Sequence, residues 1–193
     1  MADANAAYTL RDLGVLKALD RFDLLMLEQP LSFDDLVDHA TLQKQLKTPI
    51  CLDESIKAPD DARRALDLGS CRIINIKSGR VGGLSNSKAI HDYCRAHGAP
   101  VWCGGMLETG IGRAHNVALA SLPGFTFPND ISTNARYYEH DLVEPVFTLN
   151  PDGTITVPRG PGIGVQVLPD RLESVTLTKR DWNLSGSSDA PPR

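Results

Sequence analysis

Apolar runs of about four residues recur along the first half of the chain, and each run ends on a charged residue. Successive charged positions are 25, 25 and 24 residues apart. A repeat of this length suits one strand followed by one helix, because a barrel of ~250 residues with eight such units averages about 31 residues per unit. The charged residues that end the runs are Asp3, Glu28, Asp53 and Lys77.

Segments with apolar residues at helical spacing lie between the runs. Thr9 and Asp12 are spaced as an N-cap pair at the start of the first such segment, and Gly69 is placed to end the third. Two further strands are expected at residues 100–103 and 125–131. Strands that alternate with helices predict an α/β fold with a parallel sheet, here a partial (β/α) barrel. The expected helices cover residues 10–20, 34–47, 60–68, 85–97 and 110–122.

The character of the sequence changes after Leu142. Residues 154–157 and 164–167 alternate as short strands or extended arms do, and one short helix is expected within residues 168–177. The last residues are small and polar, which is typical of disorder. We therefore divide the chain into a partial barrel (1–142), a C-terminal extension (143–180) and a disordered tail (181–193).

Composition excludes several classes of function. Of 193 residues, 41% are hydrophobic and 23% are charged, which is typical of a globular protein. The net charge of −4 gives no electrostatic basis for nucleic-acid binding, and no apolar stretch is long enough to span a membrane. We expect no signal peptide, and because the four cysteines lack metal-binding spacing we expect buried reduced thiols and a cytoplasmic location. Three helical histidines, His39, His91 and His97, are expected to be solvated.

The charged strand ends define the candidate chemistry. Asp3, Glu28 and Asp53 would repel one another at one end of a sheet unless a cation lay between them, and monodentate carboxylates suit Mg²⁺. Lys77, on the next strand, would then lie beside the ion as a proton-transfer group. Abstraction of a proton next to a carboxylate, with the cation stabilising the enediolate, fits this set. Two alternatives stay open: Glu54 as the ligand in place of Asp53, and Lys77 as a structural ion-pair partner.

Five stretches of sequence carry a likeness to a known family. Together they resemble the enolase superfamily, and within it the o-succinylbenzoate synthase and N-acylamino acid racemase families. The likeness is specific as a joint pattern and extends over most of the chain. The stretches are Asp3–Asn5, Met26–Pro30, Leu52–Ser55, Asn75–Gly83 and Gly104–Asn116.

The resemblance implies a ligand set and a substrate site. It implies that Mg²⁺ is bound by Asp3, Glu28 and Asp53, and that Lys77 faces a small carboxylate substrate. It implies either the dehydration that forms o-succinylbenzoate in menaquinone biosynthesis or the racemisation of an N-acylamino acid. It also implies that the segment after residue 142 packs on a capping domain. The residues implied to contact substrate are Asn5, Gly105, Met106 and Glu108.

The sequence departs from this family in one respect. Family members carry an N-terminal capping domain and earlier barrel strands, one of which bears a Lys-x-Lys pair, and these features do not occur in this sequence. We therefore expect the chain to be the C-terminal part of a longer enzyme and to be inactive alone. An unpaired sheet edge would favour aggregation or self-association into a homo-oligomer. A non-catalytic metal-binding or assembly module is the alternative from another class.

Overall fold

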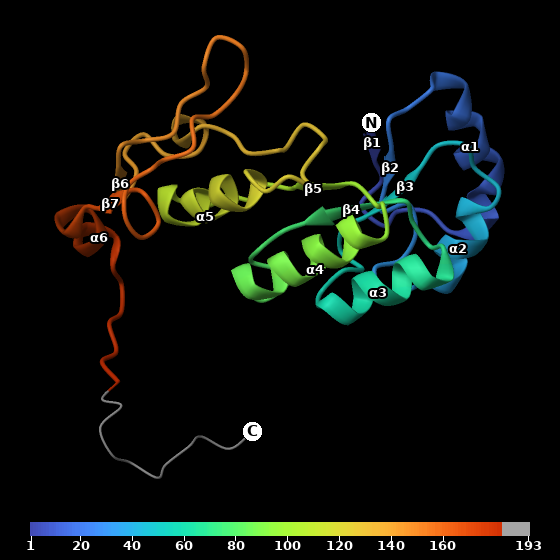
Figure 1. The fold of residues 1–193 in the computed structure, drawn as a ribbon, viewed down its shortest axis with the longest axis horizontal. Coiled ribbons are helices and arrows are strands. Elements are labelled where there is room, and N and C mark those ends of the chain that lie inside the picture. The colour runs from blue at the N-terminus through green and yellow to red at the C-terminus, as the bar shows by residue number, and fades with distance from the viewer. Residues whose placement is uncertain (183–193) are drawn as a thin grey trace.

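A computed structural model gives the structure of residues 1–182, and the greater part of the predicted disordered tail lies outside the described residues. Five parallel strands form one sheet in the order in which they occur along the chain. Helices cover the outer side of this sheet, as Figure 1 shows. The predicted parallel α/β architecture is thereby confirmed. The strands are β1 (Ala2–Asp3), β2 (Leu27–Glu28), β3 (Ile50–Leu52), β4 (Ile73–Ile76) and β5 (Val101–Cys103).

The strand register places the charged residues at one end of the sheet. Asp3 is paired with Glu28, and Glu28 is paired with Cys51, so Asp53 lies two residues further along its strand. Parallel strands point their carboxyl ends in the same direction, and ligands of parallel α/β proteins bind at that end. The sheet therefore brings side chains together that are about 25 positions apart in sequence.

The predicted helices are present. The first is split: α1 (Leu13–Ala18) lies between two 3₁₀ turns, Leu10–Asp12 and Leu19–Phe22. The Thr9 hydroxyl accepts from the Arg11 N–H at 3.2 Å, and Asp12 Oδ2 accepts from the Thr9 N–H at 2.9 Å, which confirms the predicted cap. The remaining outer helices are α2 (Val37–Gln43), α3 (Pro59–Leu68), α4 (Leu84–Ala96) and α5 (Gly110–Ala120). The bounds of α3 and α4 agree with the prediction within one residue, and α2 and α5 are shorter than predicted.

The strand predicted at residues 125–131 is wrong. Only an isolated parallel bridge between Phe125 and Val101 forms there. Pro128 has no backbone N–H and so cannot donate to a sheet ladder at this position. Within the described residues, the parallel sheet therefore has five strands.

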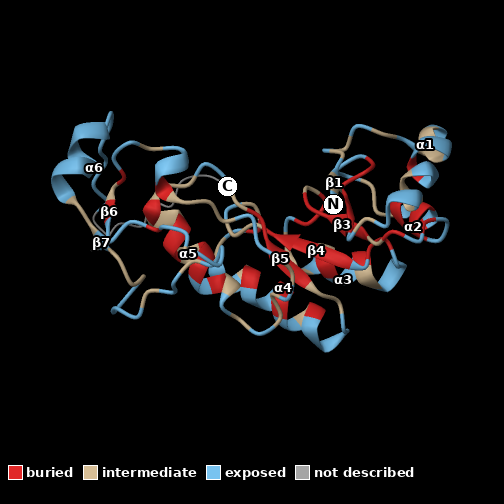
Figure 2. Ribbon diagram, turned by 90° about the horizontal axis from the view of Figure 1, so that it is seen from above, coloured by how far each residue is buried: buried red, intermediate tan, exposed pale blue. Residues whose placement is uncertain are grey.

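Strands β2 to β5 are buried on both faces, as the red strands in Figure 2 show. The outer face packs against the helices through residues such as Leu52 and Ile74. The inner face has its own smaller cluster, in which the Trp102 indole N–H donates to Cys51 Sγ at 3.2 Å. Burial on both faces explains why the strands read as continuous apolar runs. The inner cluster contains Met26, Cys51, Ile73 and Trp102, with Phe127 packed against it.

The C-terminal part of the chain has a different construction. Here β6 (Val143–Glu144) and β7 (Gln166–Val167) form a two-stranded antiparallel sheet, followed by α6 (Pro169–Val175). The predicted short helix is confirmed, whereas residues 154–157 form no strand. This part lies at the end of α5 opposite the N-terminal strands (Figure 1) and is mostly exposed (Figure 2).

Two histidines contradict the prediction that they are solvated. His39 is fully buried, and its Nε2 accepts from the Leu31 N–H at 3.2 Å. His91 is buried as well, and its Nε2 accepts from the Gly124 N–H at 3.1 Å. Each ring accepts a hydrogen bond from a backbone N–H that the fold removes from water. The spacing of apolar residues along a helix cannot identify such a partner. His97 is exposed, as predicted.

All four cysteines are free and buried, which confirms the prediction of buried reduced thiols. Among residues 1–182, no helix has the length and apolar character that crossing a membrane requires.

Candidate active site

Four charged residues lie at or just past the C-terminal ends of four neighbouring strands. Asp3 ends β1, Glu28 ends β2, Asp53 follows β3 and Lys77 follows β4. Glu28 and Asp53 are each only 2% exposed, whereas Asp3 is exposed. Two carboxylates are thus removed from water at the end of the sheet where the sequence predicted a site.

Asp53 is held by two cations. Lys77 Nζ donates to Asp53 Oδ2 at 2.7 Å, and the Arg80 guanidinium contacts the other carboxylate oxygen. Arg80 also donates to the carbonyl oxygens of Ile56 and Asn75, each at 2.6 Å. Burial lowers the pKa of Arg80 to about 10, so the side chain stays protonated at neutral pH. Arg80 stands in the turn that follows Lys77, and its role was not predicted from the sequence.

Glu28 occupies a different environment. Its Oε1 accepts from Asn75 Nδ2 at 2.8 Å. Burial raises the pKa of Glu28 to about 7; the Asn75 hydrogen bond opposes this, and the charge of Asp3 adds to it. Glu54 raises the pKa further and Lys77 lowers it. A proton or a cation at this position would relieve the repulsion among the carboxylates.

The carboxylates at the strand ends have oxygen donors of the kind that a hard cation prefers, but they are not close enough together to coordinate one. Within residues 1–182, no group of three or more His, Cys, Asp or Glu side chains is placed to hold a metal ion. Asp3 instead accepts from Asn5 N at 2.9 Å and Asn5 Nδ2 at 2.8 Å. However, Glu54 Oε2 is buried without a hydrogen-bond partner, and carboxylate oxygens are the donors that Mg²⁺ prefers. The donor types therefore suit Mg²⁺, although Asp53 is bound here by Lys77 and Arg80.

Gln29 fixes the relative position of two strand ends. Its backbone has φ of 35°, in the left-handed region that non-glycine residues rarely adopt. Its fully buried side chain accepts at Oε1 from the Asp53 N–H at 3.0 Å and donates from Nε2 to Ser55 Oγ at 2.7 Å. This role of Gln29 was not predicted from the sequence. Strained, fully bonded residues of this kind are concentrated at functional sites.

The glycine turn after β5 lies against the same end of the sheet. Gly104 N donates to Asn75 Oδ1 at 2.8 Å, and a Cβ on Gly105 would lie 2.0 Å from the Asp130 carbonyl oxygen. Met106 is 56% exposed. Glu108 closes the turn by accepting from the Met106 N–H at 2.8 Å, and it also accepts from Asn116 Nδ2 at 3.0 Å. These bonds give Glu108 a structural role in addition to the substrate contact predicted for it.

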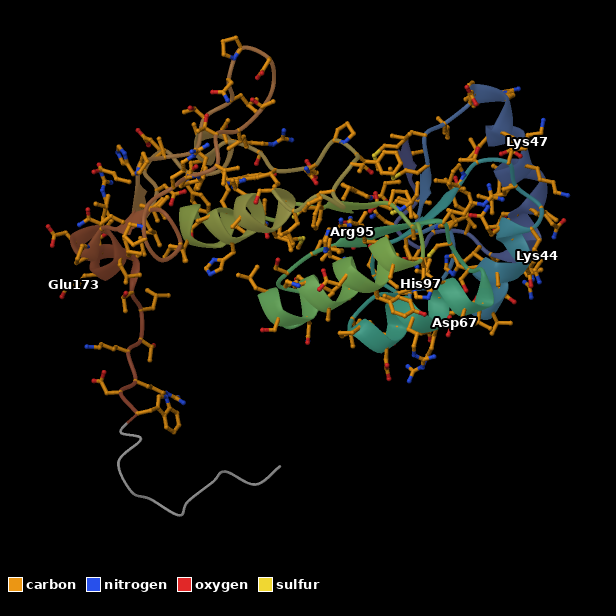
Figure 3. All side chains as sticks on the ribbon, viewed as in Figure 1. Lys44, Lys47, Asp67, Arg95, His97 and Glu173 are labelled. Carbon is orange, nitrogen blue, oxygen red and sulfur yellow. The ribbon has the colours of Figure 1, made fainter. Side chains whose placement is uncertain are left out.

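The opposite end of the sheet has a different character. A cavity of about 600 Å³ lies there, lined by residues that include Arg72, Phe127 and residues 97–100, which follow α4. Figure 3 labels Lys44 and Arg95 at the ends of α2 and α4, where a cation complements the helix dipole. In a parallel sheet this is the end associated with stability, so we do not place the reaction there.

Comparisons with known proteins agree with this geometry. The chain belongs to the enolase C-terminal domain-like family, which matches residues 1–171. It is 61% identical over 176 residues to an o-succinylbenzoate synthase from Geobacillus stearothermophilus, covering 91% of this chain and 47% of that protein. It is 54% identical over 177 residues to an N-succinylamino acid racemase from an Amycolatopsis species, covering 92% of this chain and 48% of that protein. The resemblance inferred from the strand-end motifs is confirmed.

Solved structures lead to the same family. An enolase superfamily member from Listeria innocua superposes with a TM-score of 0.86 at 52% identity, covering 90% of this chain and 47% of that one. The chain spans about half the length of the curated relatives that it matches.

Proposed function

We propose that this chain forms the cation-binding part of an enzyme that abstracts a proton next to a carboxylate. The observation that carries this proposal is the contact between Lys77 and Asp53, 2.7 Å apart, beside the buried Glu28. The reaction we favour is that of o-succinylbenzoate synthase, because relatives with that name are 61% and 60% identical to this chain. Racemisation of an N-acylamino acid is the alternative, supported by the 54% identical Amycolatopsis relative.

Three carboxylates would hold the cation: Asp3, Glu28 and Asp53. Glu54 is the alternative ligand, since its buried Oε2 has no hydrogen-bond partner. When bound, Mg²⁺ stabilises the negative charge that develops on the substrate carboxylate as the proton leaves. The Asn75 amide holds Glu28, and the Gln29 amide holds the backbone of Asp53, so two of the ligands are already positioned.

Lys77 is the residue we assign to proton transfer. Its side chain is 21% exposed and its ammonium lies at the end of β4, from which it can reach a ligand above the sheet. The Asp53 carboxylate fixes the position of Nζ. Arg80 contacts the same carboxylate and is largely buried, so charge at Asp53 stays balanced if Lys77 moves away.

The substrate would lie between the strand ends and the glycine turn. Met106 is exposed, Gly105 packs closely against the Asp130 carbonyl oxygen and holds the turn in place, and Asn5 extends from the end of β1. We assign substrate contact to Asn5, Gly105, Met106 and Glu108. Exposed apolar residues of the segment after residue 142, such as Leu149 and Val175, support its proposed packing on a capping domain.

Calorimetry tests the cation site on the 193-residue chain. We expect Mg²⁺ binding by the unmodified chain and its loss in Asp53→Asn, because the substitution removes one ligand charge. Asp170→Asn, on the exposed face of α6, is the matched control and should bind as the unmodified chain does. Equal binding by both variants would contradict the assignment of Asp53.

Turnover separates the enzyme from a non-catalytic metal-binding module. The chain is joined to the N-terminal portion of the Geobacillus stearothermophilus relative and assayed for synthase and racemase activity. We expect synthase activity that falls by a factor of at least about 10³ in Lys77→Ala, because general acid–base groups contribute 10²–10⁴-fold and Lys77 also supports Asp53. Lys88→Ala, a surface variant, is the control. A folded, Mg²⁺-binding chimaera without either activity would favour the module.

A further inference from the structure

Asn75 is a fully buried polar residue in the middle of the candidate site. It lies on β4 two residues before Lys77, so the two side chains leave the strand on the same face. A buried amide is costly unless both its donor and its acceptor groups are hydrogen-bonded. The partners of Asn75 therefore show what the buried amide does.

The two halves of the Asn75 amide contact two different functional segments. Oδ1 accepts from the Gly104 N–H at 2.8 Å, at the start of the glycine turn after β5. Nδ2 donates to Glu28 Oε1, also at 2.8 Å, at the end of β2. A backbone N–H can only donate, so the Gly104 contact fixes the orientation of the amide and directs its NH₂ group to Glu28.

The contacts around Gly104 leave little freedom for the amide to move. A Cβ added to Gly104 would lie 2.5 Å from Asn75 Oδ1 and 2.6 Å from Lys77 Cε. The backbone of Asn75 is also held in place, because Arg80 Nη2 donates to the backbone carbonyl oxygen of Asn75 at 2.6 Å. Since the amide is planar, a shift of Glu28 that turns Nδ2 must also turn Oδ1 away from Gly104.

We propose that Asn75 is a positioning residue that couples cation binding at Glu28 to the conformation of the glycine turn. This inference rests on the proposed function, because it takes Glu28 as a cation ligand. A cation that fixes the Glu28 carboxylate fixes the Asn75 amide, which in turn holds the Gly104 N–H and the start of the substrate-contacting turn. The coupling is reciprocal, so a substrate that orders the turn tightens cation binding.

Asn75→Leu tests the coupling, because leucine has the same number and branching of side-chain heavy atoms as asparagine and removes both hydrogen bonds. Mg²⁺ affinity is measured by calorimetry on the 193-residue chain, and exchange of the Gly104 amide hydrogen is followed by NMR with and without Mg²⁺. We expect the dissociation constant to rise at least about tenfold, as is usual when a partner of a metal ligand is removed. We also expect Mg²⁺ to slow Gly104 exchange in the unmodified chain and to have no effect on it in Asn75→Leu.

Asn129→Leu is the matched control. Asn129 Oδ1 accepts from the Cys103 N–H at 2.7 Å, one residue before Gly104, so its loss removes a similar bond at the same strand end. Mg²⁺ affinity should stay within twofold in this variant. If Asn75→Leu does not fold, Gly104→Ala displaces the Asn75 amide from the other side. Its control is Gly124→Ala, whose Cβ would instead lie 2.4 Å from His91 Nε2.

The outcomes separate this inference from the proposed function. No Mg²⁺ binding by the unmodified, folded chain would overturn both. Binding that is unchanged in folded Asn75→Leu or Gly104→Ala would overturn the coupling alone. A Gly104 amide that exchanges faster in the variant while Mg²⁺ affinity is unchanged would also overturn it, since Asn75 would then only support the turn.

Discussion

Residues 1–133 bury apolar side chains on both faces of a parallel sheet, whereas residues 134–182 join the rest of the chain through a small apolar cluster and a few polar groups. In the first region, β3 and β4 are buried at every position. In the second, Leu177 is 100% exposed and Trp182 is 78% exposed. The first region thus has a core of its own, and the second has apolar surface that this chain leaves uncovered.

Several contacts between the two regions lie along α5. Asp141 Oδ1 accepts from the Gly110 N–H at 2.7 Å, and within the second region the other Asp141 oxygen accepts from Asn134 Nδ2 at 2.5 Å. Phe147 packs on Ala114 and Val117 of the same helix. The comparison shows that a covalently continuous chain can contain one region stabilised by burial and another whose position depends on a few bonds.

The largest expected effect comes from a change within the sheet. Ile74→Ala removes a fully buried side chain from β4, and such a change costs about 2–5 kcal/mol in the free energy of unfolding. Val175→Ala, on α6, removes apolar atoms from a residue that is 60% exposed and should cost about 0.5 kcal/mol or less. Chemical denaturation measures both. Similar costs at the two sites would contradict the difference between the regions.

An intermediate effect is expected at the contact between the regions. Asp141→Ala leaves the Gly110 N–H and the Asn134 amide without their acceptor, which should cost about 1.5–3 kcal/mol locally. We expect faster hydrogen exchange and faster proteolysis in residues 134–182, with exchange in β3 and β4 unchanged. Asp152→Ala, in an exposed loop of the same segment, is the control. Loosening of the parallel sheet in Asp141→Ala would show that the regions form one cooperative unit.

The smallest effect is a dependence of stability on pH in the first region. Burial lowers the pKa of His39 from its ordinary value of 6.5, so the unfolded chain takes up a proton at a higher pH than the folded one. His39 therefore contributes stability above about pH 6.5 that is lost as the pH falls. Unfolding measured at pH 7.5 and 5.5 should show a smaller acid loss in His39→Gln. His140→Gln, an exposed site in the second region, should leave the loss unchanged.

The sequence was sufficient for the repeating part of the molecule. The strands at residues 50–52 and 73–76 read as continuous apolar runs because both faces of the sheet are buried. The cap formed by Thr9 and Asp12 was readable because its partners are three residues apart. The strand expected at 125–131 does not form. The prediction relied on the apolar composition of this segment and gave too little weight to Pro128, which has no backbone N–H to donate to a neighbouring strand.

The candidate site could be located but not constructed from the sequence. The period near 25 residues identified Asp3, Glu28, Asp53 and Lys77, because parallel strands carry their ends to one edge. The period of the strand ends does not predict which side chains form hydrogen bonds from one strand to another. The roles of Gln29 and Asn75, and the contact of Arg80 with Asp53, arise between residues that are 24 to 47 positions apart.

The sequence by itself determined the order of strands and helices from β1 to α5, the end of the sheet where charged groups gather and the family to which the chain belongs. These features follow from local sequence patterns, because alternation of buried and exposed positions and helix caps both involve residues that are close together in the sequence. Only the tertiary structure decided that His39 and His91 are buried acceptors and that Asn75 joins Glu28 to the glycine turn. The physical reason is that a polar group removed from water takes the partner that packing places beside it, and this partner is often distant in sequence.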